Sequence, residues 1–238
     1  MEYLAHVEGE RKQSVKEHLY GTAKLAGDFA GRFGKKEWGY CCGMLHDIGK
    51  YSDAFQERIR NKSNRLVDHA TAGAKVCLDQ GGCYSFLSYC IAGHHAGLPD
   101  YGNSSDSGSA RSLMGRRKKE IQDFTAYKKE IQIPQINAAP FDPRQSPDPD
   151  FSLSFFIRML YSCLVDADFL DTENFMKNGN AERDTGEAPE ILLKRLEQYI
   201  AGWLSNEKTD TVNGRRTEIL KHCLSCGKLK RGMFQLTV

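Results

Sequence analysis

Two short segments of the sequence place metal-binding side chains next to each other. His46 and Asp47 come directly after an apolar stretch, with Lys50 three residues further on. His94 and His95 stand in a Gly-His-His-Ala-Gly segment. Two adjacent imidazoles are hard to explain by packing, and the flanking glycines let the backbone turn both rings toward one point. Both segments therefore predict ligands rather than core histidines.

Three further residues extend this set. His18 and His69 each belong to a predicted helix, and Asp168 lies on a long one. A lone histidine near apolar residues is more often packed in a core or used as a cap than bound to a metal. These single residues become candidate ligands because the two paired segments accompany them.

The residue types indicate transition metals. Imidazole and carboxylate ligands together suit manganese, iron, cobalt or nickel, whereas structural zinc sites are richer in cysteine. A carboxylate can bridge two cations about 4 Å apart, and such a pair lowers the pKa of bound water and clamps a phosphodiester for in-line attack. This chemistry needs no serine or cysteine nucleophile. The sequence predicts a hydrolytic site with two metals, centred on His46 and Asp47.

The elements that must position these side chains are helices. Apolar residues recur at three- and four-residue steps through most of the chain, which is the pattern of amphipathic helices. We expect helices at residues 14–33, 37–46, 68–79, 84–93, 151–171, 189–204 and 215–226, with Asp68 as a possible N-cap of the third. The sequence has no strongly alternating strand pattern and no internal repeat, so the predicted fold class is all-α.

Residues 99–150 differ from this helical pattern. Residues 99–112 are rich in Gly, Ser, Asn and Asp, and residues 134–150 are rich in proline, which predicts loops. Between the loops we expect a short basic helix on the surface, which carries Arg116, Arg117, Lys118, Lys119, Lys128 and Lys129. Its charges either form a solvated face or meet the phosphates of a nucleic acid, with Arg116, Arg117, Lys118 and Lys119 as the candidates.

Composition excludes some classes of protein. The 238 residues include 33 basic and 31 acidic ones, a net charge of +2, so any contact with nucleic acid depends on local patches. No apolar run approaches the ~20 residues that cross a bilayer, and the polar start resembles no signal peptide. We therefore expect a cytoplasmic protein without membrane contact. Cys223 and Cys226 form a lone CxxC without the second ligand pair of a structural zinc site.

The ordered series resembles a known family. His18, His46-Asp47, His69, His94-His95 and Asp168 follow one another as in the HD phosphohydrolase superfamily. The segments HisAspIleGlyLys, GlyHisHisAlaGly and LeuValAspAlaAspPheLeuAspThrGlu are similar to the HD nuclease domain of the helicase-nuclease of type I CRISPR interference, in its I-C form. The resemblance implies an HD-domain helical bundle over residues 1–205, with 99–150 as a loop-rich insertion, and a linker helix over 206–238 that leads toward an absent helicase motor.

The resemblance also implies roles for the candidate residues. One metal would be held by His18, His46, Asp47 and Asp168, and Asp47 would bridge to a second held by His69, His94 and His95. Lys50 would lie near the scissile phosphate. Asp166 competes with Asp168, but the two lie about 200° apart on a helix, so only one can face the site. We choose Asp168, which matches the family's Ala-Asp-aromatic pattern, and Asp166 could orient a ligand. For Asp171 we expect a local cap or ion pair.

The implied activity is cleavage of single-stranded DNA, as an endo- and exonuclease, with a helicase motor and an RNA-guided CRISPR surveillance complex as partners. The sequence lacks a Gly-x-x-x-x-Gly-Lys-Ser/Thr motif, so strand separation is expected from a motor on the same longer chain or on another subunit. An alternative is an HD phosphohydrolase for small nucleotides or cyclic dinucleotides, which needs a closed pocket rather than an open groove. A third hypothesis is a helical interaction module whose histidines are structural.

Overall fold

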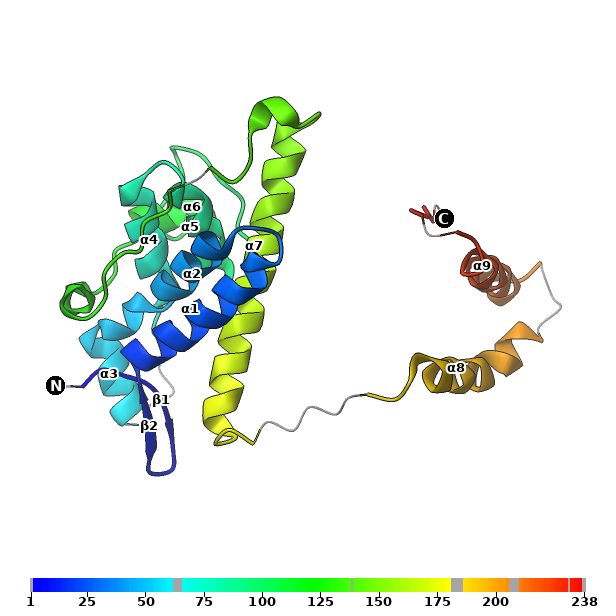
Figure 1. Cartoon of the computed structure of the whole chain (residues 1–238), viewed down its shortest axis with the longest axis horizontal. Coiled ribbons are helices and arrows are strands. Elements are labelled where there is room, and N and C mark those ends of the chain that lie inside the picture. The colour runs from blue at the N-terminus through cyan, green and yellow to red at the C-terminus, as the bar shows by residue number, and fades with distance from the viewer. Residues whose placement is uncertain are drawn as a thin grey trace. The chain divides into compact units, whose positions relative to one another are not determined.

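A computed structural model describes residues 2–61, 66–137, 139–180, 186–205, 210–230 and 232–236 (Figure 1). The chain divides into two compact units, Met1–Ala181 and Glu182–Val238. In the described part of the first unit, the regular elements are helices and one hairpin, which confirms the expected all-α bundle. All the candidate ligands belong to this unit.

The hairpin is the first element of the chain and was not expected from the sequence. Strand β1 (Leu4–Glu8) pairs in antiparallel fashion with β2 (Arg11–Ser14), and Gly9 in the turn has a φ of +61°. The polar side chains of β2 give no alternating apolar pattern, so nothing in that segment predicted a strand. Tertiary contacts hold the hairpin instead: Gln56 accepts a hydrogen bond from the Leu4 amide (2.9 Å) and donates to its carbonyl (3.0 Å).

Helices α1 (Val15–Gly31) and α2 (Lys36–Leu45) lie against each other and form one side of the core (Figure 1). Ser14 and Glu17 form a capping box that fixes the start of α1. The two helices approach closely because Gly43 faces the backbone of Ala23, where a Cβ atom would overlap it. His46 and Asp47 follow α2 directly, so this packing fixes their position.

The remaining elements of the bundle follow in order. They are the 3₁₀ turn η1 (Ile48–Tyr51), α3 (Asp53–Arg60), α4 (Ala70–Gln80), α5 (Tyr84–Gly93) and the long helix α7 (Pro149–Met176), which packs against α1, α2 and α5 (Figure 1). The core contains large apolar side chains that are fully buried, among them Trp38, Leu45, Ile48, Leu87, Ile91, Leu160 and Leu164. The N-cap of α4 is His69 rather than the expected Asp68, although the Asp68 carboxylate accepts a hydrogen bond from the Thr71 amide in the first turn (3.1 Å).

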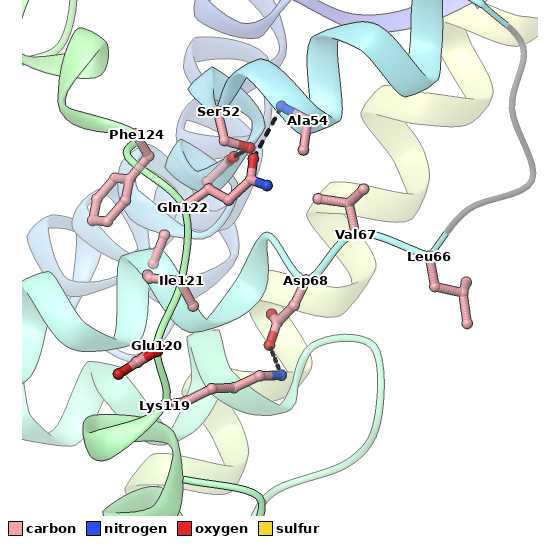
Figure 2. A pocket seen from close by; sticks show the side chains of 12 residues that line it. Ser52, Ala54, Leu66, Val67, Asp68, Lys119, Glu120, Ile121, Gln122 and Phe124 are labelled. Atoms are coloured by element: carbon pink, nitrogen blue, oxygen red, sulfur yellow. Dashed lines mark hydrogen bonds and ion pairs between the residues drawn. The ribbon is translucent and has the colours of Figure 1, made fainter.

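The expected basic helix of the insertion is confirmed only for Arg116, Arg117 and Lys118, whereas Lys128 and Lys129 lie in a separate turn. The structure has α6 (Leu113–Lys118), an extended segment at 119–124, and the 3₁₀ turns η2 (Thr125–Lys129) and η3 (Pro143–Gln145). In the extended segment the Lys119 carbonyl accepts a hydrogen bond from Lys75. The Gln122 side chain accepts one from the Ala54 amide, as Figure 2 shows. Leu113, Tyr127 and Ile131 are buried in the core, so the insertion is more than a surface excursion.

The second unit contains α8 (Pro189–Leu204) and α9 (Val212–Cys226). The Thr217 hydroxyl donates a hydrogen bond to the Trp203 carbonyl and links the two helices (3.2 Å). In the sequence, the first unit ends at Ala181 and the second begins at Glu182, whereas the boundary expected from the sequence follows residue 205. A linker role for residues 206–238 stays a prediction. Among the described residues, no helix combines the length and apolar character required to cross a membrane.

Candidate metal centre

The seven predicted ligands converge in one small volume. They form two clusters, within each of which the ligand atoms lie no more than 4.8 Å apart. The first cluster consists of His18, His46, Asp47 and Asp168, and the second consists of Asp47, His69, His94 and His95. Asp47 belongs to both clusters, as a bridging carboxylate would. Whether these residues hold metal stays a prediction.

Two of the imidazoles are oriented by the same kind of hydrogen bond, to a carbonyl three residues earlier. His46 follows the end of α2 and donates its Nδ1 proton to the Gly43 carbonyl (2.7 Å). His94 follows the end of α5 and donates to the Ile91 carbonyl at the same distance. Each ring therefore uses a free carbonyl of the last helical turn, and its Nε2 atom remains available toward Asp47.

His69 reaches the site because two backbones approach closely. Gly49 in η1 lies against the backbone of His69, and a Cβ atom at position 49 would overlap the His69 carbonyl. This contact brings the start of α4 beside Asp47, so His69 Nε2 lies 3.5 Å from Asp47 Oδ1. The glycine of the HisAspIleGlyLys segment thus has a packing role.

The first cluster is buried and surrounded by acceptors. His18 Nε2 lies 3.3 Å from both Asp47 Oδ2 and Asp168 Oδ1. His46 Nε2 lies 3.4 Å from Asp47 Oδ2 and 3.6 Å from Asp168 Oδ1. The side chains of both histidines are fully buried, and that of Asp168 is 17% exposed. Two imidazole nitrogens and two carboxylates facing one point form a donor set that suits a divalent transition metal.

The second cluster has buried polar atoms without partners. His94 Nε2 lies 3.3 Å from Asp47 Oδ1, yet among the described residues neither atom has a hydrogen-bond partner. His69 Nε2 and His95 Nε2 approach each other to 2.8 Å. Buried acceptors rarely remain unsatisfied, and a cation would satisfy all of these atoms at once. The residues present therefore fit the metal that the donor set implies.

Asp171 corrects the expectation of a purely local role. Its Oδ2 atom accepts hydrogen bonds from His18 Nδ1 (2.8 Å) and Gln13 Nε2 (2.9 Å). A Cβ atom on Gly21 would overlap this carboxylate, so the absence of a side chain at 21 admits Asp171. Asp171 therefore orients His18, whereas Asp166, the residue considered for such a role, is exposed on α7.

Replacing Asp171 by asparagine is expected to weaken metal binding without unfolding the chain. The variant keeps the shape of the side chain but loses the charge that orients His18, and such outer contacts are worth about 10–100-fold in metal affinity. Calorimetric titration with manganese would measure the change, with Asp166→Asn as the matched control on the same helix. Equal affinities for the two variants would contradict the role of Asp171.

Lys50 contacts both the bridging carboxylate and a histidine that the sequence analysis missed. Lys50 Nζ lies 2.6 Å from Asp47 Oδ2 and 3.2 Å from His6 Nε2. His6 Nδ1 donates to Gln13 Oε1 (3.1 Å), and Gln13 in turn contacts Asp171. The hairpin thus connects Lys50 with the carboxylate that orients His18. His6 was missed because the hairpin was not predicted, although its apolar neighbours Leu4, Ala5 and Val7 were a possible sign of a strand.

The clusters hold their carboxylates ionised, and these carboxylates raise the pKa values of His18 and His46. Burial opposes protonation of His46, but Asp47 and Asp168 raise its pKa to about 10. Burial disfavours the Asp47 carboxylate, yet Lys50 and His46 hold the pKa of Asp47 well below its usual range. In the second cluster, burial and His94 lower the pKa of His95 to about 4, so His95 is neutral and ready to bind a cation at pH 7.

Metal binding is therefore expected to release at least one proton near pH 7, because only the neutral imidazole of His46 can be a ligand. With the pKa of His46 raised to about 10, protons compete with the metal below that pH. Affinity should therefore rise with pH up to this raised pKa. Calorimetry in two buffers of different ionisation enthalpy measures the released protons. The same apparent enthalpy in both buffers would contradict the prediction.

The predicted basic strip is largely engaged inside the protein. Arg116 donates to the Thr71 hydroxyl (3.1 Å), and Lys118 donates to the carbonyls of Ser104 and Asp106. Lys119 forms an ion pair with Asp68 (2.5 Å), drawn in Figure 2 at the edge of a pocket beside η1. Arg117 is exposed. Contact of this strip with nucleic acid stays a prediction.

A cleft opens beside the second cluster. It has a volume of about 700 Å³, and His69, His95 and Lys50 line it together with β1, the hairpin turn and α3. His95 is exposed, whereas His18 and His46 are fully buried. Access to the clusters therefore leads along His69 and His95.

Comparison with known proteins agrees with this geometry. No curated protein matches the chain. Residues 15–131 match the sequence model of the family described as HD domain. The matched segment includes six of the seven candidate ligands and ends before Asp168. The chain thus contains an HD domain at residues 15–131, which indicates a metal-dependent hydrolase.

Proposed function

We propose that this chain is a metal-dependent nuclease that hydrolyses phosphodiester bonds of single-stranded DNA. The observation that carries the proposal is a pair of His/Asp clusters, each with ligand atoms close enough to hold one metal ion, that share Asp47 and adjoin a cleft lined by Lys50 and Arg58. The HD domain supplies the reaction class, a hydrolysis that depends on a divalent metal. The nature of the substrate is inferred from the cleft.

The two clusters would hold two divalent ions of manganese, iron, cobalt or nickel, with Asp47 as the shared ligand. When bound, such a pair activates water and stabilises the charge that develops on the phosphate. Lys50 Nζ, 2.6 Å from Asp47 Oδ2, would contact the scissile phosphate and orient it. His6 and Asp47 hold the Lys50 ammonium in place, so its charge does not have to be ordered when substrate binds.

The depth of the site favours a flexible substrate. His18, His46 and Asp47 are at most 1% exposed, and the route to them follows His69 and His95. A rigid duplex does not enter such a recess, whereas a single strand can thread into a positively charged groove. The cleft offers Lys50 and Arg58 for the phosphates of a strand.

The biological setting of the proposal is type I CRISPR interference. Its support is the resemblance of the motif series around His46-Asp47, His94-His95 and Asp168 to the nuclease domain of that system. In this setting a helicase motor, on the same longer chain or on a separate subunit, would deliver the strand after an RNA-guided surveillance complex has bound the target. The site would act as an endo- and exonuclease.

A substrate panel tests the proposal. The metal-loaded protein is incubated with labelled single-stranded DNA, the matched duplex, mononucleotides and cyclic dinucleotides. We expect rapid cleavage of the single strand alone, inhibition by chelator, and better recovery with manganese, cobalt or nickel than with magnesium, because imidazole ligands favour the softer ions. Added salt should slow cleavage, since strand binding releases counterions. Turnover of a small nucleotide with the DNA strand intact would instead identify a nucleotide phosphohydrolase.

A further inference from the structure

The cleft beside the second cluster has one wall formed by helix α3. Phe55, Arg58 and Ile59 of α3 line it together with Glu8 and Gly9 of the hairpin, and His69 and His95 line it as well. A strand that reaches the clusters through this cleft therefore passes between α3 and the hairpin. The side chains of these two walls decide which substrate binds well.

Phe55 organises the cationic wall. Its ring is 4% exposed and meets the His69 ring edge-on, with 5.4 Å between centroids. Lys50 Nζ lies 5.6 Å from the Phe55 centroid, and Arg58 Cζ lies 5.8 Å from it. One buried ring therefore contacts His69 of the second cluster and both cations, Lys50 and Arg58.

The two cations differ in whether a carboxylate of the protein neutralises their charge. Lys50 is 5% exposed and paired with Asp47. Arg58 is half-buried, and among the described residues no carboxylate forms an ion pair with it. A guanidinium that is held by an aromatic ring and free of carboxylates can bind a phosphate with two hydrogen bonds.

The basic strip of the insertion does not offer a comparable cation on the wall of this cleft. Its Lys119 is neutralised by Asp68, and Lys118 donates to two carbonyl groups. Among these candidates, Arg58 alone combines an uncompensated charge with a place on the cleft wall beside the second cluster.

We propose that Arg58 binds a phosphate of the substrate strand next to the scissile one, so that the strand runs between α3 and the hairpin. This inference rests on the proposed function and names a binding residue for it. The exposed Glu8 carboxylate of the hairpin lines the same cleft, so it repels these phosphates and weakens binding. Removing either charge changes strand affinity, in opposite directions.

Binding is tested with the full-length chain and a labelled phosphorothioate DNA strand that resists cleavage, by fluorescence anisotropy at several salt concentrations. Arg58→Gln should weaken binding about tenfold, the effect of one charged hydrogen-bonded contact, and should reduce the salt slope by about 0.7, the value for one phosphate contact on a single strand. Arg58→Lys should recover part of the affinity. Glu8→Gln should bind more tightly than the unmodified chain.

The matched control is Arg144→Gln, which removes the same charge from an exposed arginine in η3, away from the cleft. Binding by Arg58→Gln that equals binding by Arg144→Gln, with no gain for Glu8→Gln, would overturn the inference. A cleavage assay on ordinary single-stranded DNA separates this failure from that of the proposed function. If the unmodified protein cuts the strand and Arg58→Gln has an unchanged KM, the function stands and the role of Arg58 falls.

Discussion

The asparagine variant of Asp47 is expected to lose hydrolysis by about a thousandfold or more while the chain still folds. Asp47 is the one ligand shared by the two clusters, so its change weakens both together. Several kcal/mol of charge stabilisation depend on the metals, and each ~1.4 kcal/mol is a factor of ten in rate. The amide oxygen that remains in the variant can still lie against the Lys50 ammonium, which is 2.6 Å from the carboxylate of Asp47.

Asparagine is a better test here than alanine. Lys50 is 5% exposed and pairs with Asp47, so it would lose its ion-pair partner in the alanine variant. Breaking a buried pair in this way costs about 3–5 kcal/mol. Circular dichroism and thermal unfolding would confirm that Asp47→Asn is folded, and cleavage of a labelled single strand would measure its activity. Substantial activity in the folded variant would show that hydrolysis occurs elsewhere.

The alanine variant of Asp168 is expected to lose activity by about a hundredfold or more, and Asp166→Ala is expected to remain within about twofold of the unmodified chain. Asp168 contacts His18 and His46 at the first cluster, whereas Asp166 is exposed on another face of α7. The second cluster contains neither residue, so Asp168→Ala should still bind one metal ion with the ligands of that cluster.

Elemental analysis of the purified variants distinguishes this prediction from simple misfolding. Asp168→Ala should carry half as much metal as Asp166→Ala, and both should unfold at similar temperatures. The opposite order of activities, with Asp166→Ala the more damaged, would move the ligand to the other aspartate and contradict the geometry of α7.

The helical part of the fold could be predicted from the sequence because each helix repeats an apolar stripe. The prediction for residues 84–93 matches α5, and those for α1 and α2 deviate by only one or two residues at either end. Helix α3 was missed because its eight residues are mostly polar and too few to repeat an apolar stripe beyond Phe55 and Ile59. The hairpin was missed because it is stabilised by long-range contacts between Leu4 and Gln56, and its own residues show no alternating apolar pattern.

The candidate ligands were predictable for a different reason. His46-Asp47 and His94-His95 are visible as adjacent pairs, and the family resemblance supplied the partners that lie far away in sequence. The surrounding contacts could not be inferred in this way. Asp171 is 153 residues from His18, and only the packing of α7 on α1 beside Gly21 shows that they meet. Arg58 likewise gains its importance from Phe55 and the cleft, neither of which leaves a motif.

The first cluster can be completed only late in synthesis, because its ligand Asp168 lies in α7. Asp168 leaves the ribosome 121 residues after Asp47 (168 − 47), which takes roughly 6–24 s at translation rates of roughly 5–20 residues per second. A growing chain that has passed the end of α5 and reached His95 already contains every ligand of the second cluster but lacks the last ligand of the first, and also Asp171. Nascent chains therefore pass through a stage with half of the centre, and the complete centre arises only after α7 has docked.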